Sequence, residues 1–312
     1  MKNMKAVRIH EYGGPEVLIF EEAPQPVPGS GEVLIRVHSA GVNPIDWKIR
    51  AGFLKDVHPY TFPLILGWDL SGVVEATGPG AGKFKKGDEV YSRPDSSRNG
   101  AYAQYIAVKE SEVAFKPRSI DHIHASAIPL ACLTAWQAIF DTAGLSAGQK
   151  ILIHAAAGGV GSFAVQLAKW KGAYVIGTAS GRNQSFLQEL GVDQPIDYEE
   201  TQFEDLVRDV DVVFDTLGGD IQKRSWKVLK KGGFLVSIAA PPSAEEAAKI
   251  GVRQALIRMA PNSAELTEIA GLVDTGKLKP VVETIMPLSD ARQAHELSQM
   301  GHARGKIVLR VV

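Results

Sequence analysis

The stretch that decides the fold is residues 150–170, which read KILIHAAAGGVGSFAVQLAKW. An apolar run from Ile151 to His154 leads into a glycine-rich turn, and apolar side chains then recur at helical spacing. The members of that helical stripe are Val160, Phe163, Ala164, Leu167 and Ala168. A strand, a tight turn and a helix in this order predict the start of a βαβ unit, and therefore a parallel sheet.

The glycine-rich turn has the spacing of a dinucleotide-binding fingerprint, with Ala156 in the place of the first glycine. Gly158 would let the backbone approach a pyrophosphate, and Gly161 would let the helix pack close to the strand. The helix amino terminus would offer N–H groups and a positive dipole end to the phosphates. A glycine triplet alone also serves as a plain turn, but further strand–helix units follow. We therefore predict that Gly158, Gly159 and Val160 bind a dinucleotide.

The next strand indicates which dinucleotide is bound. An enzyme that uses NAD places an acidic residue about 20 residues after the glycines, where it binds the ribose 2′-hydroxyl. Ala179 occupies that place here, and the polar residues Ser180 and Arg182 follow it. A hydroxyl and a planar cation suit a 2′-phosphate. We expect NADPH rather than NADH, although Arg182 is also compatible with a plain solvated loop residue.

The rest of the chain divides into a β-rich part and an α/β part. Short β-branched and aromatic runs separated by glycine and proline fill the first third, and strand–helix alternation begins after Ser119. We predict one domain of residues 1–122 plus 277–312 and a second of residues 123–276. A helix from Ile128 to Thr142, kinked at Pro129, would open the second domain. The strand-like run Val252–Met259 and a helix at Ala264–Asp274 would complete it.

Composition excludes several classes of protein. Of the 312 residues 45% are hydrophobic and 22% are charged, which is typical of globular domains and not of disordered chains. The formal net charge of −1 provides no field that would gather nucleic acid or anionic lipid. The single cysteine, Cys132, indicates no disulfide framework, and the amino terminus has no apolar signal-peptide core. We expect a soluble cytoplasmic protein with no membrane span.

Several segments together resemble the zinc-free quinone and enone reductase branch of the medium-chain dehydrogenase/reductase superfamily. They are AGVNPIDWKIRAG, GWDLSGVVEATGPG, FKKGDEVY, GAYAQYIAV and GHARGKIVL, with the AAAGGVG loop between them. The resemblance covers nearly the whole chain. It implies an α/β fold with an N-terminal GroES-like β-barrel domain and a Rossmann domain with a doubly wound parallel sheet.

The resemblance also implies that the catalytic zinc site is missing. Zinc alcohol dehydrogenases of this superfamily have a cysteine where this chain has Asn43, and a His-Glu pair where it has Trp68 and Asp69. A further metal-binding cysteine is replaced by Leu130. Asparagine and tryptophan are not the thiolate and imidazole ligands that zinc prefers. We expect no protein-bound metal.

Without a Lewis acid, the favoured substrate delocalises its own negative charge. Hydride addition to an α,β-unsaturated carbonyl gives an enolate and addition to a quinone gives a phenolate, so the protein need only orient the reactants and hydrogen-bond the oxyanion. We expect an NADPH-dependent reductase of small enones or quinones. Two alternatives stay open: a zinc-independent carbonyl reductase, and an NADPH-binding sensor without useful turnover.

Three residues are candidates for the catalytic site. Asn43, in a VNP-D motif, is the first choice for a polar group near the nicotinamide and the substrate carbonyl, although it would equally cap a helix begun by Pro44. Asp46 belongs to the same motif, more as a structural partner. Tyr60 is a candidate proton donor, with plain aromatic packing as the alternative.

The remaining candidates are carried over from the resemblance as cofactor-binding residues. Thr134 lies in the predicted helix from Ile128 to Thr142. The others lie at or after the ends of predicted strands or in the returning tail, and they are Tyr198, Leu217, Gly218, Ile238 and Lys306. Ligands of parallel α/β sheets bind at the carboxyl ends of strands, which agrees with this placement. Members of this family often form dimers through the sheet edge of the cofactor domain. The resemblance therefore makes Val252–Met259 the candidate edge for a homodimer.

Overall fold

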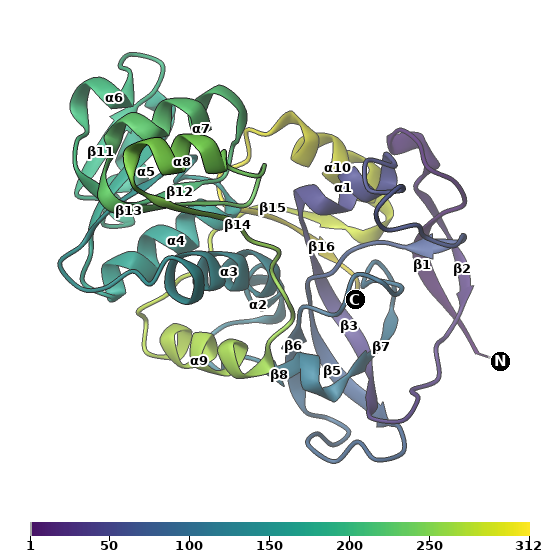
Figure 1. The fold of residues 1–312 in the computed structure, drawn as a ribbon. Coiled ribbons are helices and arrows are strands. Elements are labelled where there is room, and N and C mark those ends of the chain that lie inside the picture. The colour runs from purple at the N-terminus through teal and green to yellow at the C-terminus, as the bar shows by residue number, and fades with distance from the viewer. Residues whose placement is uncertain (1) are drawn as a thin grey trace. The chain divides into compact units, whose positions relative to one another are not determined.

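The computed structural model describes residues 2–312, and the chain forms two compact units. One unit runs to Leu133 and resumes at Ala260, and the other is Thr134–Met259. Figure 1 shows the course of the chain through both.

The second unit contains one parallel sheet of six strands. The strands are β9 (Lys150–Ile153), β10 (Tyr174–Ala179), β11 (Gln194–Asp197), β12 (Val210–Asp215), β13 (Leu229–Ser237) and β14 (Arg253–Leu256). Their spatial order is β11-β10-β9-β12-β13-β14. Numbered along the sheet's own chain, this is the 3-2-1-4-5-6 order of doubly wound dinucleotide-binding folds. The order reverses between β9 and β12, and that reversal marks the point where ligands bind in such sheets.

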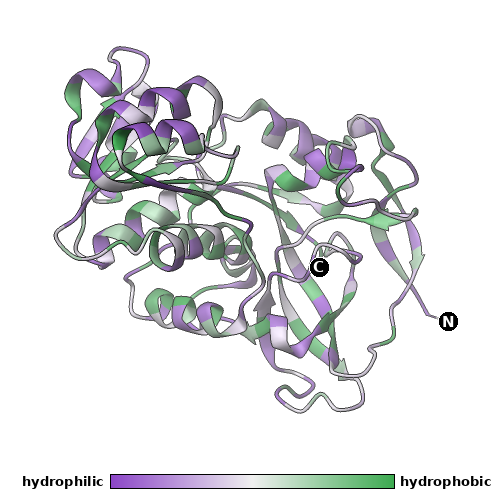
Figure 2. Cartoon of the chain, in the orientation of Figure 1, coloured by the Kyte–Doolittle hydropathy of each residue, from purple (hydrophilic) through white to green (hydrophobic). Residues whose placement is uncertain are grey.

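Helices connect these strands and cover the sheet. They are α4 (Gly159–Trp170), α5 (Gln184–Glu189), α6 (Phe203–Leu206), α7 (Gly219–Ser225) and α8 (Ala244–Ile250). An apolar cluster lies in the core of this unit, with Leu152, Ile176, Val213 and Leu235 all buried. Polar residues dominate α7, and α8 places charged residues beside its buried Ala247 (Figure 2). This is the amphipathic arrangement that the sequence periodicity predicts.

The first unit is built on two sheets. A three-stranded sheet has the order β2-β1-β4, with β1 at Asn3–Ile9, β2 at Ile19–Pro24 and β4 at Leu64–Ile65. The larger sheet has the order β15-β16-β3-β5-β6-β8, and β7 also pairs with β3. Its strands are β3 (Glu32–Val42), β5 (Leu70–Thr77), β6 (Glu89–Ser92), β7 (Tyr105–Lys109), β8 (Val113–Phe115), β15 (Val282–Pro287) and β16 (Lys306–Arg310).

The tail of the chain returns to the β-rich unit as predicted. β16 pairs antiparallel with β3, with Ile307 opposite Val42. The helices of this unit are α1 (Pro44–Arg50), α2 (His122–Ser126), α9 (Ser263–Asp274) and α10 (Ala291–Met300).

The long helix predicted from Ile128 to Thr142 is two elements. The helix α3 spans Pro129–Trp136, and a π-helical turn at Gln137–Thr142 follows it. Pro129 is the first residue of α3 and not a kink. A proline suits that position because the first turn of a helix leaves its N–H groups without helical partners.

The compact units differ from the predicted domains at both ends of the α/β part, which is Thr134–Met259 rather than 123–276. The prediction that the helix at Ala264–Asp274 completes the α/β unit is wrong. That helix, α9, buries Leu266, Ile269 and Val273 in the β-rich unit, where the Tyr91 hydroxyl donates to the Leu266 carbonyl. Its apolar stripe fits either partner, so periodicity alone did not identify the one it packs on.

Within residues 2–312, no helix combines the length and the apolar character that a membrane crossing requires.

Candidate functional site

The glycine loop follows β9 and opens α4. A Cβ added to Gly161 would lie 2.2 Å from the Ala155 carbonyl oxygen and 2.8 Å from the Ala156 Cα, so only glycine fits there. At Gly158 the nearest contact would be 3.3 Å. Ala155, with φ of 48°, takes the left-handed conformation of the turn. The sequence therefore assigned the packing role of Gly161 correctly, and the left-handed alanine was not anticipated.

The loop presents an uncapped helix terminus. Gly158 is the N-cap residue of α4, and no side chain caps the helix. Gly158, Gly159 and Val160 are half-buried. N–H groups without a side-chain cap, together with the positive end of a 12-residue helix, suit an anionic pyrophosphate. The loop fits the dinucleotide that the fingerprint predicts.

The other predicted cofactor residues of this unit gather at the same edge. Each lies just beyond the carboxyl end of a strand: Ser180 and Arg182 after β10, Tyr198 after β11, Leu217 and Gly218 after β12, and Ile238 after β13. Ser180 is buried, whereas Tyr198 and Leu217 are each 53% exposed. The parallel sheet thus brings together residues that lie up to about 80 positions apart in the sequence, as ligand sites of such sheets require.

The sequence analysis did not include Asp215, which organises two of these loops. Its fully buried carboxylate accepts from the main-chain N–H groups of Leu217 and Gly218 at 3.0 and 2.8 Å. The second oxygen accepts from Gln222 Nε2 and Ser237 Oγ, both at 2.8 Å. One carboxylate therefore fixes the ends of β12 and β13. Its position at the end of an apolar strand was the available signal.

An acidic side chain also lies beside the predicted 2′-phosphate position. The N–H of Gly181, between Ser180 and Arg182, donates to the Glu199 carboxylate at 3.3 Å. Glu199 is exposed. A 2′-phosphate at this loop would compete with Glu199 for that N–H and would be repelled by its charge. At a 2′-phosphate site, the charges of Arg182 and Glu199 would act in opposite directions.

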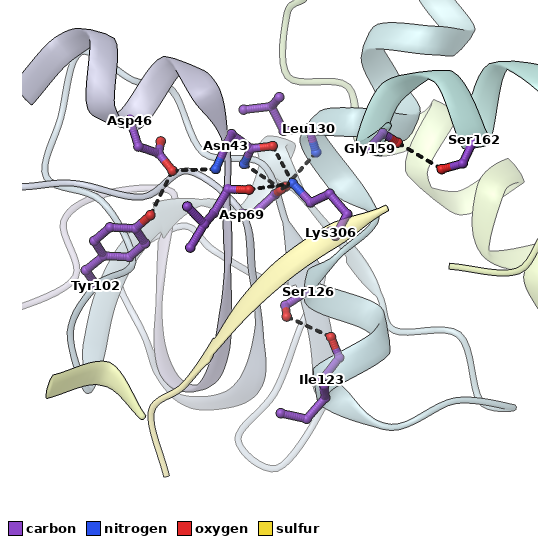
Figure 3. Close-up of polar contacts among 11 residues, drawn as sticks. Asn43, Asp46, Asp69, Tyr102, Ile123, Ser126, Leu130, Gly159, Ser162 and Lys306 are labelled. Carbon is purple, nitrogen blue, oxygen red and sulfur yellow. Dashed lines mark hydrogen bonds and ion pairs between the residues drawn. The ribbon is translucent and has the colours of Figure 1, made fainter. Parts of the chain in front are cut away.

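In the β-rich unit, a buried polar network joins Asn43, Asp69 and Lys306 (Figure 3). The Asn43 Nδ2 donates to Asp69 Oδ2 at 2.8 Å, and the Lys306 Nζ lies 3.1 Å from the same oxygen. Lys306 also donates to the Val42 carbonyl at 3.0 Å and to the Asn43 Oδ1. The exposed fractions are 2% for Asn43, 0% for Asp69 and 4% for Lys306.

This network determines which way the Asn43 amide points. Lysine only donates hydrogen bonds, so the Asn43 atom that meets Lys306 Nζ must be the oxygen. The nitrogen then faces Asp69, which only accepts when ionised. An amide nitrogen carries two protons, and Asp69 uses one of them. The second is available as a donor to a carbonyl or oxyanion.

Asp46 supports Asn43 from the first turn of α1. Its Oδ2 accepts from the Asn43 main-chain N–H and from the Tyr102 hydroxyl, both at 2.8 Å (Figure 3). Its Oδ1 is buried and has no hydrogen-bond partner among the described residues. Burial raises the pKa of the Asp46 carboxyl to about 7. Asn43 is the N-cap residue of α1, but its side chain enters the network and does not cap the helix.

Two further predicted residues lie outside this network. Tyr60 is half-buried, with its ring 4.9 Å from that of His58 and 6.4 Å from that of Trp68 between centroids. Burial raises the pKa of the Tyr60 phenol to about 12, so it stays protonated at neutral pH. Thr134 is buried in α3. Lys306, predicted to bind cofactor, instead directs its ammonium group to Val42, Asn43 and Asp69.

The donor set around Asn43 does not fit zinc. Asp69 Oδ1 accepts from the Leu130 N–H at 2.6 Å, and its Oδ2 is shared by Asn43 and the Lys306 ammonium. A bound dication would have to replace that ammonium group. Across residues 2–312, no three histidine, cysteine, aspartate or glutamate side chains are grouped as metal ligands. Structural zinc and catalytic zinc sites both draw their protein ligands from these types.

Comparison with known protein families finds two matching family models. Residues 29–118 match the alcohol dehydrogenase GroES-like domain, and residues 190–309 match a family described as zinc-binding dehydrogenase. The chloroplastic NADPH-dependent alkenal/one oxidoreductase of Arabidopsis thaliana is 36% identical, over 99% of this chain and 80% of its own length.

Solved structures of similar fold match this chain over nearly its whole length. The quinone oxidoreductase from Coxiella burnetii has a TM-score of 0.94 and 37% identity, with 100% of both chains covered. A mycobacterial protein solved in complex with NADPH has a TM-score of 0.89 and 30% identity, covering 99% of this chain and 100% of its own. Together with the GroES-like domain and the doubly wound sheet, these similarities show that the chain is an oxidoreductase of the quinone and enone oxidoreductase branch of the medium-chain dehydrogenase/reductase superfamily.

Proposed function

We propose that the protein is an NADPH-dependent, zinc-independent reductase of the C=C bond of α,β-unsaturated carbonyls or of quinones. The observation that carries the proposal is the Asn43 amide, held by Lys306 and Asp69 so that one N–H remains for an acceptor oxygen. The Arabidopsis relative named for alkenals and alkenones and the Coxiella structure named for quinones support the same substrate class.

When bound, NADPH supplies a hydride equivalent to the acceptor. The task of Asn43 Nδ2 is to donate to the acceptor oxygen as negative charge gathers there. A fixed donor in a buried place stabilises such charge more than water does, because it need not reorient during the reaction. Lys306 and Asp69 keep the amide in that orientation. Conjugated acceptors suit this modest donor because they spread the charge themselves.

The second requirement is a proton for the α-carbon of an enolate. The Tyr60 phenol is the side-chain candidate: like any tyrosine it is protonated at neutral pH, and burial raises its pKa further, to about 12. Water is the other source. A Tyr60→Phe variant separates the two, because the solvent isotope effect and the pH profile of turnover change only if the phenol is used.

Cofactor choice belongs to the proposal as well. Ala179 leaves the end of β10 without a carboxylate, and Ser180 and Arg182 suit a 2′-phosphate. The mycobacterial relative was solved with NADPH, which supports the same choice. Titration of the protein with NADPH and with NADH tests it, and tighter binding of NADH would contradict it.

A panel of acceptors tests the reaction. We expect NADPH oxidation with conjugated enones and quinones, and the saturated ketone as the product from an enone. An allylic alcohol would instead indicate a carbonyl reductase. Tight NADPH binding without oxidation by any acceptor would indicate a cofactor-binding protein that does not turn over.

A further inference from the structure

Four neighbouring strands of the β-rich unit end at one edge of the larger sheet. The pairs Ile307 with Val42, Ala40 with Leu70, and Leu70 with Ser92 fix the register of β16, β3, β5 and β6. One residue beyond the paired ends, the register places Lys306 opposite Asn43 and Asp69 opposite Arg93. Asp69 is level with Gly41 on β3, and the hydrogen bond from Asn43 to Asp69 joins the two pairs into one row of polar side chains. The first three form the network described above, and the fourth has not yet been assigned a role.

Arg93 is buried without a partner. It is only 8% exposed, and its Nε has no hydrogen-bond partner in the described part of the chain. No ion pair involves Arg93 within residues 2–312, although Arg98 and Arg224 are both paired with carboxylates there. Removing a guanidinium from water without a partner is costly, so such a group is unusual.

The carboxylates near Arg93 accept from other donors, except for one oxygen of Asp46, whose Oδ1 has no hydrogen-bond partner among the described residues. Asp69 binds Lys306 and Asn43, and Glu112 binds the Arg98 Nη2 at 2.7 Å. Asp95 accepts from the Ser97 N–H at 2.8 Å. Burial lowers the pKa of Arg93, and the fields of these carboxylates oppose that shift. The guanidinium thus remains charged while its N–H donors stay unassigned.

We propose that Arg93 binds an anionic carboxylate on the acceptor, so that the preferred substrates are conjugated oxo-acids rather than neutral enones. This inference rests on the proposed function, because it assigns the Asn43 amide to the acceptor carbonyl. The planar fork of arginine matches a carboxylate bidentately. The row then offers one donor to the carbonyl, at Asn43, and a second, charged donor to the far end of the same molecule. The glycine loop of the other unit would bind the phosphates of the cofactor, so those phosphates do not require Arg93.

Two acceptors that differ by one group test the proposal. In 4-oxopent-2-enoate a carboxylate replaces the terminal methyl of pent-3-en-2-one, and the conjugated ketone is otherwise the same. We expect wild type to have the higher kcat/KM on the acid. Arg93→Gln should lower kcat/KM on the acid by about tenfold to a hundredfold, the usual effect of losing a charged hydrogen bond, and change the neutral enone by less than about threefold. Arg93→Lys should fall between, because it keeps the charge and loses the fork.

Arg118→Gln is the matched control, because Arg118 is an exposed arginine of the same unit and its loss changes the net charge equally. An equal loss on both acceptors, a loss in Arg118→Gln of the same size, or a raised Kd for NADPH in Arg93→Gln would each overturn the proposal. The last result would assign Arg93 to the cofactor instead.

A binding measurement keeps the test independent of turnover. The saturated acid 4-oxopentanoate should raise the Tm of the wild-type protein in the presence of NADP⁺, and pentan-2-one at the same concentration should not. Arg93→Gln should lose this effect while keeping its own Tm within a few degrees of wild type, because the removed charge has no partner. If no acceptor is reduced but the acid still stabilises only proteins with Arg93, the proposed reaction fails and the carboxylate site stands. Equal stabilisation of both proteins would overturn the site.

Discussion

The ammonium group of Lys306 donates to the side-chain oxygen of Asn43, although the two residues lie 263 positions apart in the chain. β16 brings them together by pairing with β3, so the last strand of the chain orients a side chain near its beginning. The sequence did not indicate this contact. It holds the side chain of Asn43 in place, and the cofactor role suggested for Lys306 stays a prediction.

Replacing Lys306 separates the positioning role from the cofactor role. In Lys306→Met the Asn43 amide is free to rotate and Asp69 loses its cation, so kcat should fall by about tenfold to a hundredfold, somewhat less than the loss of an oxyanion donor itself. The Kd for NADPH should stay within about twofold, measured by fluorescence titration. Lys306→Arg, which keeps the charge, should recover part of kcat. A weakened Kd with unchanged kcat would instead support the cofactor role.

Cofactor selectivity should respond in opposite directions to the two charges beside Ser180. Arg182→Ala should raise the KM for NADPH by about tenfold, the loss of one charged phosphate contact, and leave the KM for NADH unchanged. Glu199→Gln should lower the KM for NADPH by about twofold to fivefold, because it removes a repulsive charge and frees the Gly181 N–H. Both effects should shrink at high salt. Equal changes for the two cofactors would show that this loop does not contact the 2′-phosphate.

The glycine loop offers a matched pair of substitutions. A methyl group at Gly161 would lie 2.2 Å from the Ala155 carbonyl oxygen, and one at Gly158 would lie 3.3 Å from the same atom. Gly161→Ala must therefore move α4 away from the loop. It should lower Tm by several degrees and weaken NADPH binding at least about tenfold, because misplaced N–H groups meet the phosphates poorly. Gly158→Ala should keep Tm near wild type, and any loss in cofactor binding would then come from the phosphate approach alone.

The sequence predicted the doubly wound sheet well because its signals are local. Strand, glycine turn and helix at residues 150–170 each follow from adjacent side chains, and the strand ends then place Ser180, Tyr198 and Leu217 at one edge automatically. The prediction for α9 was wrong, and the contacts of Lys306 were not anticipated, because both depend on contacts between distant segments. Arg93 belongs to none of the motifs that the sequence analysis used. Only its burial and the strand register indicate it as a binding residue.

Asp46 should make stability depend on pH. Its pKa is about 7 in the folded protein and about 3.9 in an unfolded chain, so the unfolded state binds fewer protons between these values. The folded state therefore loses stability as the pH rises from about 4 to 7. Asp46→Asn has no charge to bury, and its oxygen still accepts from Asn43 and Tyr102. Its stability relative to wild type, measured by urea unfolding, should improve as the pH rises from 5 to about 7 and then level off. A stability difference that does not change with pH would mean that the pKa of Asp46 is the same in the folded and unfolded states.

His154 should have the opposite effect, at the acidic side of neutrality. Its buried ring lies 3.1 Å from Thr178 Oγ1 and 2.9 Å from Ser225 Oγ, and burial lowers its pKa to about 4. An unfolded histidine has a pKa of about 6.5, so the unfolded state binds the extra proton first and stability falls as the pH drops from 6.5 to 4. The slope should be up to about 1.4 kcal/mol per pH unit for this group. His154→Gln keeps polar atoms for both hydroxyls and does not titrate, so its urea-unfolding free energy should fall less steeply over this range. Equal slopes for the two proteins would show that the pKa of His154 is the same in the folded and unfolded states.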